Sequence, residues 1–378
     1  MSIEVGPRIS YASFLIAVLS SKLGNTIRMS MKRRVFLAAG TAATIVTIGG
    51  LGNHLSVEAQ ANRTINLYSA RHYDTDNAIY EGFTKKTGIR INLIEAPADK
   101  LIERIKSEGA NTPADVLLTV DAGNLWRAQE AGLLQPVSSK VLQSVIPANL
   151  RDPQGHWFGF SKRARVIVYN KDRVKPSELS TYENLADPKW KGRLISRTSS
   201  HVYNQSLTGS VLAAHGGRKT EDWAKGLVAN FARQPQGNDT AQIKDVAAGI
   251  GDLTFVNTYY VPRLIKSDKP EDKAVAAKIG VFFPNQKDRG THINISGGGV
   301  VKTSKNRDAA IQFLEYLTTP EVQAIFARGN NEYPVRAGVP IDPVLASFGT
   351  FKEDRLNAAV FGRNNAEALK IMDRAGWK

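Results

Sequence analysis

The sequence predicts an α/β fold of two lobes with a ligand cleft between them. From Arg63 onward, short apolar runs alternate with amphipathic stretches at the spacing typical of strands and helices. The alternation starts again near Gly159, and segments 158–163 and 290–297 are the best candidates for crossings between lobes. We expect an amino-terminal lobe of residues 62–160 plus about 265–330, a second lobe of residues 161–264, and a segment, 331–378, packing across both.

The first block is expected to form three strand–helix pairs. Apolar side chains recur on one face of each predicted helix, as with Ile79, Tyr80 and Phe83, and Gly88 follows that helix as a stop. Such repetition predicts a parallel sheet covered on both faces. The expected strands are 64–69, 89–95 and 115–120, and the expected helices are 74–86, 98–107 and 122–131.

The second block is less regular. Gly216 and Gly217 are expected to stop a helix, and Asn257 to cap another whose first turn carries Tyr259 and Tyr260. The expected strands are 165–169, 194–197, 251–256, 276–283 and 292–301. The expected helices are 204–214, 222–233, 309–317 and 320–328, with a short helical or turn segment at 185–190.

Residues 1–61 have the pattern of a targeting region. Arg33-Arg34 precede Val-Phe-Leu, a moderately apolar stretch follows, and Ala59-Gln60-Ala61 ends it. The paired arginines resemble a twin-arginine export signal. Gly and Thr interrupt the apolar stretch, which disfavours a permanent membrane span. Residues 1–28 precede the usual start of such a signal, and the sequence leaves open whether translation begins upstream or at Met29 or Met31.

Composition excludes several classes of function. The 378 residues include no cysteine, which excludes disulfides, thiolate metal sites, cysteine catalysis and a lipid-bearing cysteine. The formal net charge is +15, of which about +11 lies beyond residue 60. Outside the leader these basic residues are scattered, so nucleic-acid binding is not expected. An anionic ligand or an anionic membrane surface suits such a charge equally well.

Three segments place ligand-type side chains just beyond a predicted strand. They carry His72 with Tyr73, then Tyr203, then Tyr259 with Tyr260. Ligands of open α/β sheets bind outside the carboxyl ends of the strands, so these side chains are expected to converge in a cleft. The alternative is that these residues are structural, with Tyr259 and Tyr260 straddling a helix end, one packed and one exposed.

The residue types favour a hard metal ion. Phenolate is a charged oxygen donor, and tyrosine ligates ferric haem in catalase. Soft ligands are scarce or absent, which argues against copper(I) and zinc clusters. Four phenolates on Fe(III) leave one net negative charge, which Arg163 and Arg263 are expected to offset from outside the ligand set. Common catalytic motifs such as His-Glu-x-x-His and Gly-x-Ser-x-Gly are absent, so an enzyme is not expected.

Six motifs together resemble a known family, the periplasmic ferric-iron-binding proteins of ABC importers. Among these proteins the chain is most similar to the cyanobacterial type, also described as iron-deficiency-induced protein A. The similarity covers most of residues 63–378. The motifs lie at residues 67–76, 114–116, 159–165, 257–260, 292–297 and 329–335.

The resemblance implies a two-lobed periplasmic-binding-protein fold, similar to type II, that closes on Fe(III) about a hinge. It implies five iron ligands: His72, Tyr73, Tyr203, Tyr259 and Tyr260. In some members water replaces the histidine. Many bacterial members also hold a bridging anion, but the cyanobacterial type usually does without one, and none is expected here.

The resemblance also implies partners and a location. We expect a monomer in the periplasm that delivers iron to a membrane permease and its ATPase. Some members are linked to the protection of photosystem II, and part of their pool lies inside the cell near the thylakoid. Two alternatives stay open: a protective partner of a photosynthetic complex, and a receptor of the same fold for an organic anion or polyamine.

Overall fold

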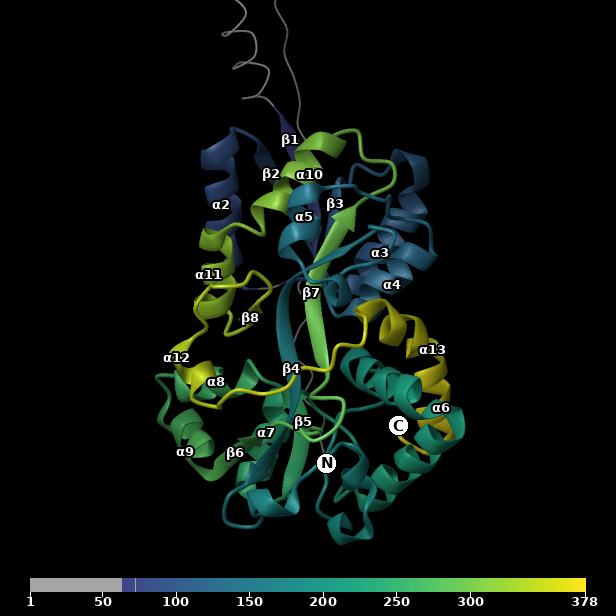
Figure 1. The fold of residues 1–378 in the computed structure, drawn as a ribbon, viewed down its shortest axis with the longest axis vertical. Helices are drawn as coiled ribbons and strands as arrows, with labels where there is room; N and C mark the ends of the chain where they lie inside the picture. Colours follow the sequence, from purple (N-terminus) through teal and green to yellow (C-terminus); the bar gives the residue numbers. More distant parts are fainter. Residues whose placement is uncertain (1–62, 72) are drawn as a thin grey trace, which may run out of the picture. The chain divides into compact units, whose positions relative to one another are not determined.

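A computed structural model of the chain describes residues 63–71 and 73–378 (Figure 1). The expected signal region, residues 1–61, and the candidate ligand His72 lie outside the described residues. None of the helices within the described ranges combines the length and hydrophobicity that crossing a bilayer requires.

The strands of the described residues pair in the order β2-β1-β3-β7-β4-β5, with β6 and β8 also paired to β4. The long strand β4 is the centre of this arrangement, and Figure 1 shows it alongside β7. The strands are β1 (Thr64–Ser69), β2 (Arg90–Glu95), β3 (Val116–Val120), β4 (Phe158–Asn170), β5 (Leu253–Asn257), β6 (Ile279–Phe282), β7 (Ile293–Val300) and β8 (Tyr333–Pro334).

β4 joins two groups of strands. Its first half, up to Ala164, pairs with β7, and its second half, from Arg165, pairs with β5 and β6. Only residues 165–169 of this 13-residue strand were expected as strand. The preceding stretch was missed because buried Ser161 and Arg163 interrupt the apolar run that marks a strand in the sequence.

The expected parallel sheet is confirmed for β1, β2 and β3, but the sheet as a whole is mixed. β7 runs antiparallel to β3, with Val116 opposite Val300, and also antiparallel to β4. β7 belongs to the second block, for which no strand direction was predicted, and it makes the sheet mixed. The physical reason is that β7 enters the first group from the second group, without the crossover helix that a parallel connection needs.

The helices confirm most of the expected amphipathic stretches. Ile79, Tyr80 and Phe83 are buried, and Gly88 ends its helix with a left-handed φ of 72°. The helices are α2 (Asp76–Thr87), α3 (Ala98–Glu108), α4 (Ala122–Glu130), α5 (Lys140–Val145), α6 (Val202–Asn230), α7 (Asp239–Ala248), α8 (Tyr260–Ile265), α9 (Pro270–Lys278), α10 (Arg307–Tyr316), α11 (Pro320–Gly329), α12 (Pro343–Ala346) and α13 (Ala358–Arg374). Short 3-10 helices are η1 (Gly109–Asn111), η2 (Ala148–Leu150), η3 (Pro176–Glu178), η4 (Glu183–Ala186) and η5 (Pro188–Trp190).

Four local predictions need correction. Residues 194–197 make only isolated bridges instead of a strand, and residues 276–278 end α9 instead of starting β6. Helix α7 was not predicted. Asn257 ends β5 and does not cap α8; Tyr259 occupies the cap position and makes no capping hydrogen bond with its side chain. Gly216 does interrupt α6, with a non-helical φ of 76°.

Two packing contacts matter for the site. α13 packs against both α4 and α6, so the end of the chain touches helices that follow different groups of strands. α9 packs against α7 and α8, and β6 pairs with the second half of β4. Residues 270–282 therefore lie against α7, α8 and the second half of β4.

Candidate metal centre

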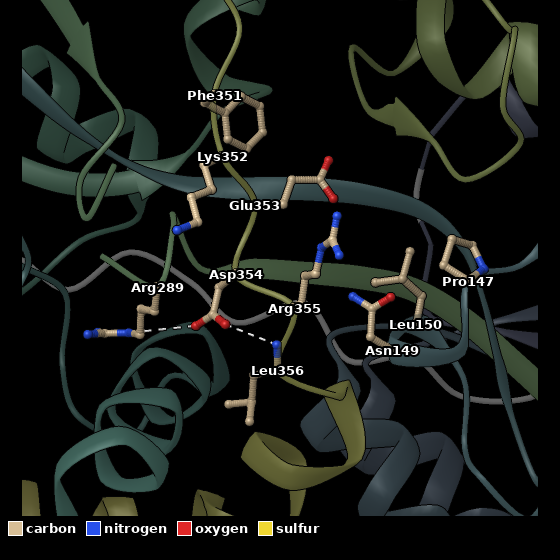
Figure 2. Close-up of a pocket in the computed structure, with 10 residues that line it drawn as sticks. All are labelled: Pro147, Asn149, Leu150, Arg289, Phe351, Lys352, Glu353, Asp354, Arg355 and Leu356. Atoms are coloured by element: carbon tan, nitrogen blue, oxygen red, sulfur yellow. Dashed lines mark hydrogen bonds and ion pairs between the residues drawn. The ribbon is translucent and has the colours of Figure 1, made fainter. Parts of the chain in front are cut away.

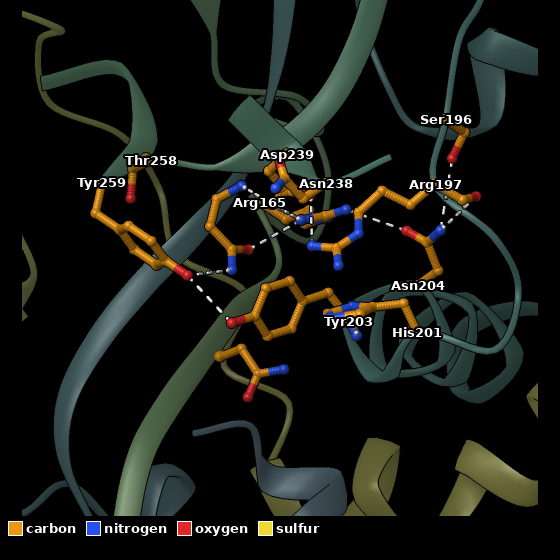
Figure 3. Close-up of polar contacts among 12 residues, drawn as sticks. Arg165, Ser196, Arg197, His201, Tyr203, Asn204, Asn238, Asp239, Thr258 and Tyr259 are labelled. Carbon is orange, nitrogen blue, oxygen red and sulfur yellow. Dashed lines mark hydrogen bonds and ion pairs between the residues drawn. The ribbon is translucent and has the colours of Figure 1, made fainter. Parts of the chain in front are cut away.

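Three of the expected tyrosines lie together at the ends of α6 and α8. Tyr203 stands in the first turn of α6, and its hydroxyl oxygen is 3.1 Å from the hydroxyl oxygen of Tyr259. Figure 3 shows these two hydroxyl groups pointing toward each other. The rings of Tyr259 and Tyr260 stack at an angle, with centroids 4.4 Å apart.

The fourth tyrosine, Tyr73, comes from the segment after β1. The guanidinium carbon of Arg263 lies 5.1 Å from the ring centroid of Tyr73 and 4.8 Å from that of Tyr259. The same group is 5.6 Å from the ring of Tyr260. One cation therefore touches tyrosines from two separate parts of the chain. The structure brings all four described tyrosines together, as expected.

The two expected arginines take different places. Arg163 on β4 is buried; its Nη1 donates to Ser296 Oγ at 2.9 Å, and its guanidinium carbon is 5.7 Å from the Tyr203 ring. Its Nε and Nη2 have no hydrogen-bond partner within the described residues. Arg263, by contrast, is exposed. Positive charge thus stands on both the buried and the solvent side of the tyrosines.

Burial makes three of these phenols, Tyr73, Tyr259 and Tyr260, harder to ionise. It raises the pKa of Tyr73 to about 12, and the nearby Glu332 carboxylate adds to the rise. Burial also raises the pKa values of Tyr259 and Tyr260 above their ordinary range, with the closeness of Tyr203 as the next cause. A metal ion that takes these oxygens as phenolates must therefore displace protons.

A buried ion network next to Tyr203 was not predicted. Asp239 at the start of α7 is fully buried and accepts from Arg165 Nη1 at 2.8 Å and from Arg197 Nη1 at 3.1 Å (Figure 3). Both guanidinium carbons lie 5.6 Å from the Tyr203 ring. Burial alone would raise the pKa of Asp239, but the two arginines outweigh it and lower that pKa.

A second buried ion network, also unpredicted, lies next to the ring of Tyr73. Arg71 is buried and pairs with Asp76 at 2.7 Å and with Glu332 at 3.3 Å. Its guanidinium carbon is 4.7 Å from the Tyr73 ring centroid. Arg71 stood inside a motif, but the sequence offered no sign that its partner lies 261 residues away.

The donor set suits a hard cation. No group of three or more His, Asp or Glu side chains placed to hold a metal occurs in the part of the chain that the structure describes. His201 stands 4.4 Å from the Tyr203 ring, and burial together with Arg197 lowers its pKa to about 3. It is therefore neutral, and its Nδ1 accepts from the Tyr203 backbone N–H at 3.2 Å. Oxygen donors of this kind suit a small, highly charged ion, and the arginines can offset the negative charge that several phenolates would bring.

Two cavities lie near the junction of the strand groups. One, of about 450 Å³, borders Tyr203 and His201 together with Asp99 and Arg127. The other, of about 880 Å³, is lined by the 351–356 segment and is drawn in Figure 2. Lys162 pairs with Glu353 of that lining, whereas its neighbour Arg163 faces Tyr203. Adjacent strand residues point to opposite faces, so the larger cavity is not part of the tyrosine site.

Two groups of strands joined through β4 and β7, with oxygen donors gathered where they meet, have the architecture of a two-lobed binding protein. Residues 69–324 match the family described as bacterial extracellular solute-binding protein. The chain therefore belongs to this family of solute-binding proteins.

Individual relatives share more than half of their aligned residues with this chain. Iron uptake protein A1 of Synechocystis is 56% identical over 356 residues, covering 92% of this chain and 99% of the relative. A solved structure of Trichodesmium FutA (IdiA) in complex with iron and citrate is 67% identical, with a TM-score of 0.82, covering 83% of this chain and 100% of that one. The unliganded FutA2 structure from Synechocystis has a TM-score of 0.81 at 57% identity, covering 84% and 99%.

Proposed function

We propose that this chain is a substrate-binding protein that captures Fe(III) and delivers it to an ABC-type importer. The observation that carries the proposal is the group of four phenols, Tyr73, Tyr203, Tyr259 and Tyr260, gathered among arginines. The relatives described as iron-uptake proteins and the FutA structure with iron support the same cargo. The proposed ligands are these four tyrosines, with His72 as a fifth candidate outside the described residues.

The proposed cargo follows from the donor set. Phenolate oxygens favour a trivalent, hard ion over softer metals, and the arginines around them limit the negative charge that four phenolates would build up. A receptor for a polyamine would instead need carboxylates facing the ligand. Here three cations, Arg163, Arg165 and Arg197, have guanidinium carbons 5.6–5.7 Å from the Tyr203 ring centroid.

We also propose a division of the chain into lobes. The first lobe contains β1 to β3, and the second contains β5 and β6, with β4 and β7 as the hinge strands between them. The pairing of β6 with β4 supports moving residues 265–290 into the second lobe. The contacts of α13 with α4 and α6 support a terminal segment that spans both lobes.

An iron titration of purified residues 62–378 tests the function. The buffer should lack carbonate, phosphate and organic acids, because no bridging anion is expected. We expect a broad visible phenolate-to-iron band that saturates at one iron per chain and that Tyr259→Phe abolishes. A folded protein without this band would refute the tyrosine site and with it the iron cargo.

Iron loading should release protons, because Tyr73, Tyr259 and Tyr260 all have raised pKa values and are neutral at pH 7. We expect about one proton per coordinating phenol, so that iron binding weakens as the pH falls. A pH-stat titration measures this, with the ferric reagent alone as the blank. Tyr260→Phe should release one proton fewer. Release no greater than the blank would contradict phenolate ligation.

The proposed partners are a membrane permease and its ATPase, reached after export by the twin-arginine route that Arg33 and Arg34 indicate. A protective association with photosystem II is a separate role. It predicts that the chain co-purifies with photosynthetic membranes even when Tyr203 and Tyr259 are replaced by Phe. Loss of that association in the variant would leave transport as the function of the chain.

A further inference from the structure

Asp121 has an unusual backbone conformation at the junction of the strand groups. It directly follows β3 and has a φ of 76° and a ψ of 128°, in the half of conformational space that non-glycine residues rarely occupy. Its side chain is fully buried. Strain of this kind persists where the surroundings hold it in place, and it clusters at functional sites.

The Asp121 carboxylate connects separate elements. Its Oδ1 accepts from Ser206 Oγ of α6 at 2.6 Å and from the Gly123 N–H of α4 at 2.8 Å. Its Oδ2 accepts from Asn294 Nδ2 of β7 at 2.8 Å. In return, Asn294 Oδ1 accepts from the N–H of Ala122 at 3.0 Å. One side chain therefore joins the end of β3, hinge strand β7 and helix α6.

Two partners of Asp121, Ser206 and Asn294, lie next to residues of the tyrosine site. Ser206 lies three residues after Tyr203, one turn along α6 and on the same side of the helix. Asn294 is the cross-strand partner of Arg163, the buried cation beside the Tyr203 ring. Asp121 thus holds the start of the tyrosine-bearing helix against the strand that faces Arg163.

We propose that Asp121 is a positioning residue for iron binding, which fixes Tyr203 relative to β7 and Arg163 through its bonds to Ser206 and Asn294. This inference rests on the proposed function. A carboxylate is needed because both of its oxygens accept hydrogen bonds, whereas asparagine offers one acceptor and one donor. Metal sites lose affinity when groups that orient the ligands are removed, typically 10- to 100-fold.

Exchanging the side chains of Asp121 and Asn294 tests the inference. Asp121→Asn sets an amide donor against the amide donor of Asn294, and Asn294→Asp sets two carboxylates face to face. The double variant Asp121→Asn with Asn294→Asp restores a donor–acceptor pair, and asparagine tolerates a positive φ at position 121. The readouts are the rate of iron release to an excess of chelator and the position of the phenolate band.

We expect each single variant to release iron about tenfold faster than the parent and to shift the band, and the double variant to return to within about twofold of the parent. The inference would be overturned if the single variants released iron at the rate of the parent protein. It would also be overturned if the double variant did not return to that rate. If Asp121→Asn does not fold, Ser206→Ala decides, because it removes only the hydroxyl group through which α6 bonds to Asp121. Iron release from Ser206→Ala at the rate of the parent protein would also overturn the inference.

Asp115→Asn is the matched control. Asp115 precedes the same strand, is buried, and accepts from the Asn66 N–H at 2.8 Å and from Ser304 Oγ at 2.6 Å, far from the tyrosines along β3. The Asp115→Asn variant should have a lower melting temperature than the parent protein but the same rate of iron release. If Asp115→Asn accelerated iron release as much as Asp121→Asn does, the effect at Asp121 would be explained by general destabilisation, and the inference would be refuted. A parent protein without the phenolate band would instead refute the proposed function itself.

Discussion

Replacing Tyr203 by Phe is expected to weaken Fe(III) binding by at least about 100-fold, with little effect on folding. The change removes one of the proposed phenolate ligands, and loss of a ligand should cost more than the 10- to 100-fold typical of groups that only orient ligands. Among the described residues, the Tyr203 hydroxyl group makes a single hydrogen bond, the 3.1 Å contact to Tyr259, so the fold loses little. Competition with a chelator of known affinity measures the change in binding.

Tyr333→Phe is the matched control for that experiment. The Tyr333 hydroxyl group is buried and has no hydrogen-bond partner within the described residues. The Tyr333 backbone pairs with Lys162 of β4, and its ring centroid lies 5.4 Å from that of Phe351, which lines the larger cavity. Removal of the Tyr333 hydroxyl group should leave iron affinity unchanged. Equal affinity of Tyr203→Phe and the parent protein would show that Tyr203 is not a ligand.

Asp239→Asn is expected to lower the free energy of unfolding by about 3–5 kcal/mol, the usual cost of removing one partner of a buried ion pair. The variant leaves Arg165 and Arg197 without the carboxylate that both contact. The measurement is denaturant unfolding at neutral pH. Glu367→Ala removes an exposed carboxylate that pairs with Arg374 at 3.4 Å, and it should change stability far less.

This effect should depend on pH in a defined direction. Because the arginines lower the pKa of Asp239 in the folded protein, its stabilising contribution is fully present above the unfolded carboxyl pKa of about 3.9. It is lost as the pH falls through the lower folded value. The difference between the parent and Asp239→Asn should therefore shrink in strong acid. A constant difference down to pH 2 would argue against the ion pair as its source.

Local pattern was enough to predict much of the site. Tyr73, Tyr203, Tyr259 and Tyr260 could be grouped because each follows a stretch expected to be a strand, although 194–197 forms only isolated bridges. Their convergence follows from topology alone, since ligands of α/β sheets gather at the carboxyl ends of strands. Arg163 was predicted as a cation beside them, but its burial within β4 was not.

The groups that hold those tyrosines could not be predicted, because their partners are remote in sequence. Asp239 lies 74 residues from Arg165, and Glu332 lies 261 residues from Arg71. A buried charge carries no periodic signal, and in the sequence each of these residues looks like a solvated one. The unusual backbone of Asp121 is equally invisible, since nothing in its neighbours marks a positive φ.

By itself the sequence determined the alternation of strand and helix, most helix ends, the lack of thiol chemistry and the four phenol donors. These depend on hydrophobic periodicity, glycine stops and residue type, which act over a few positions. Only the tertiary structure decided the antiparallel course of β7, the full length of β4 and the ion networks around the tyrosines. Those features arise from contacts between distant segments, whose energies depend on burial and geometry that no local window contains.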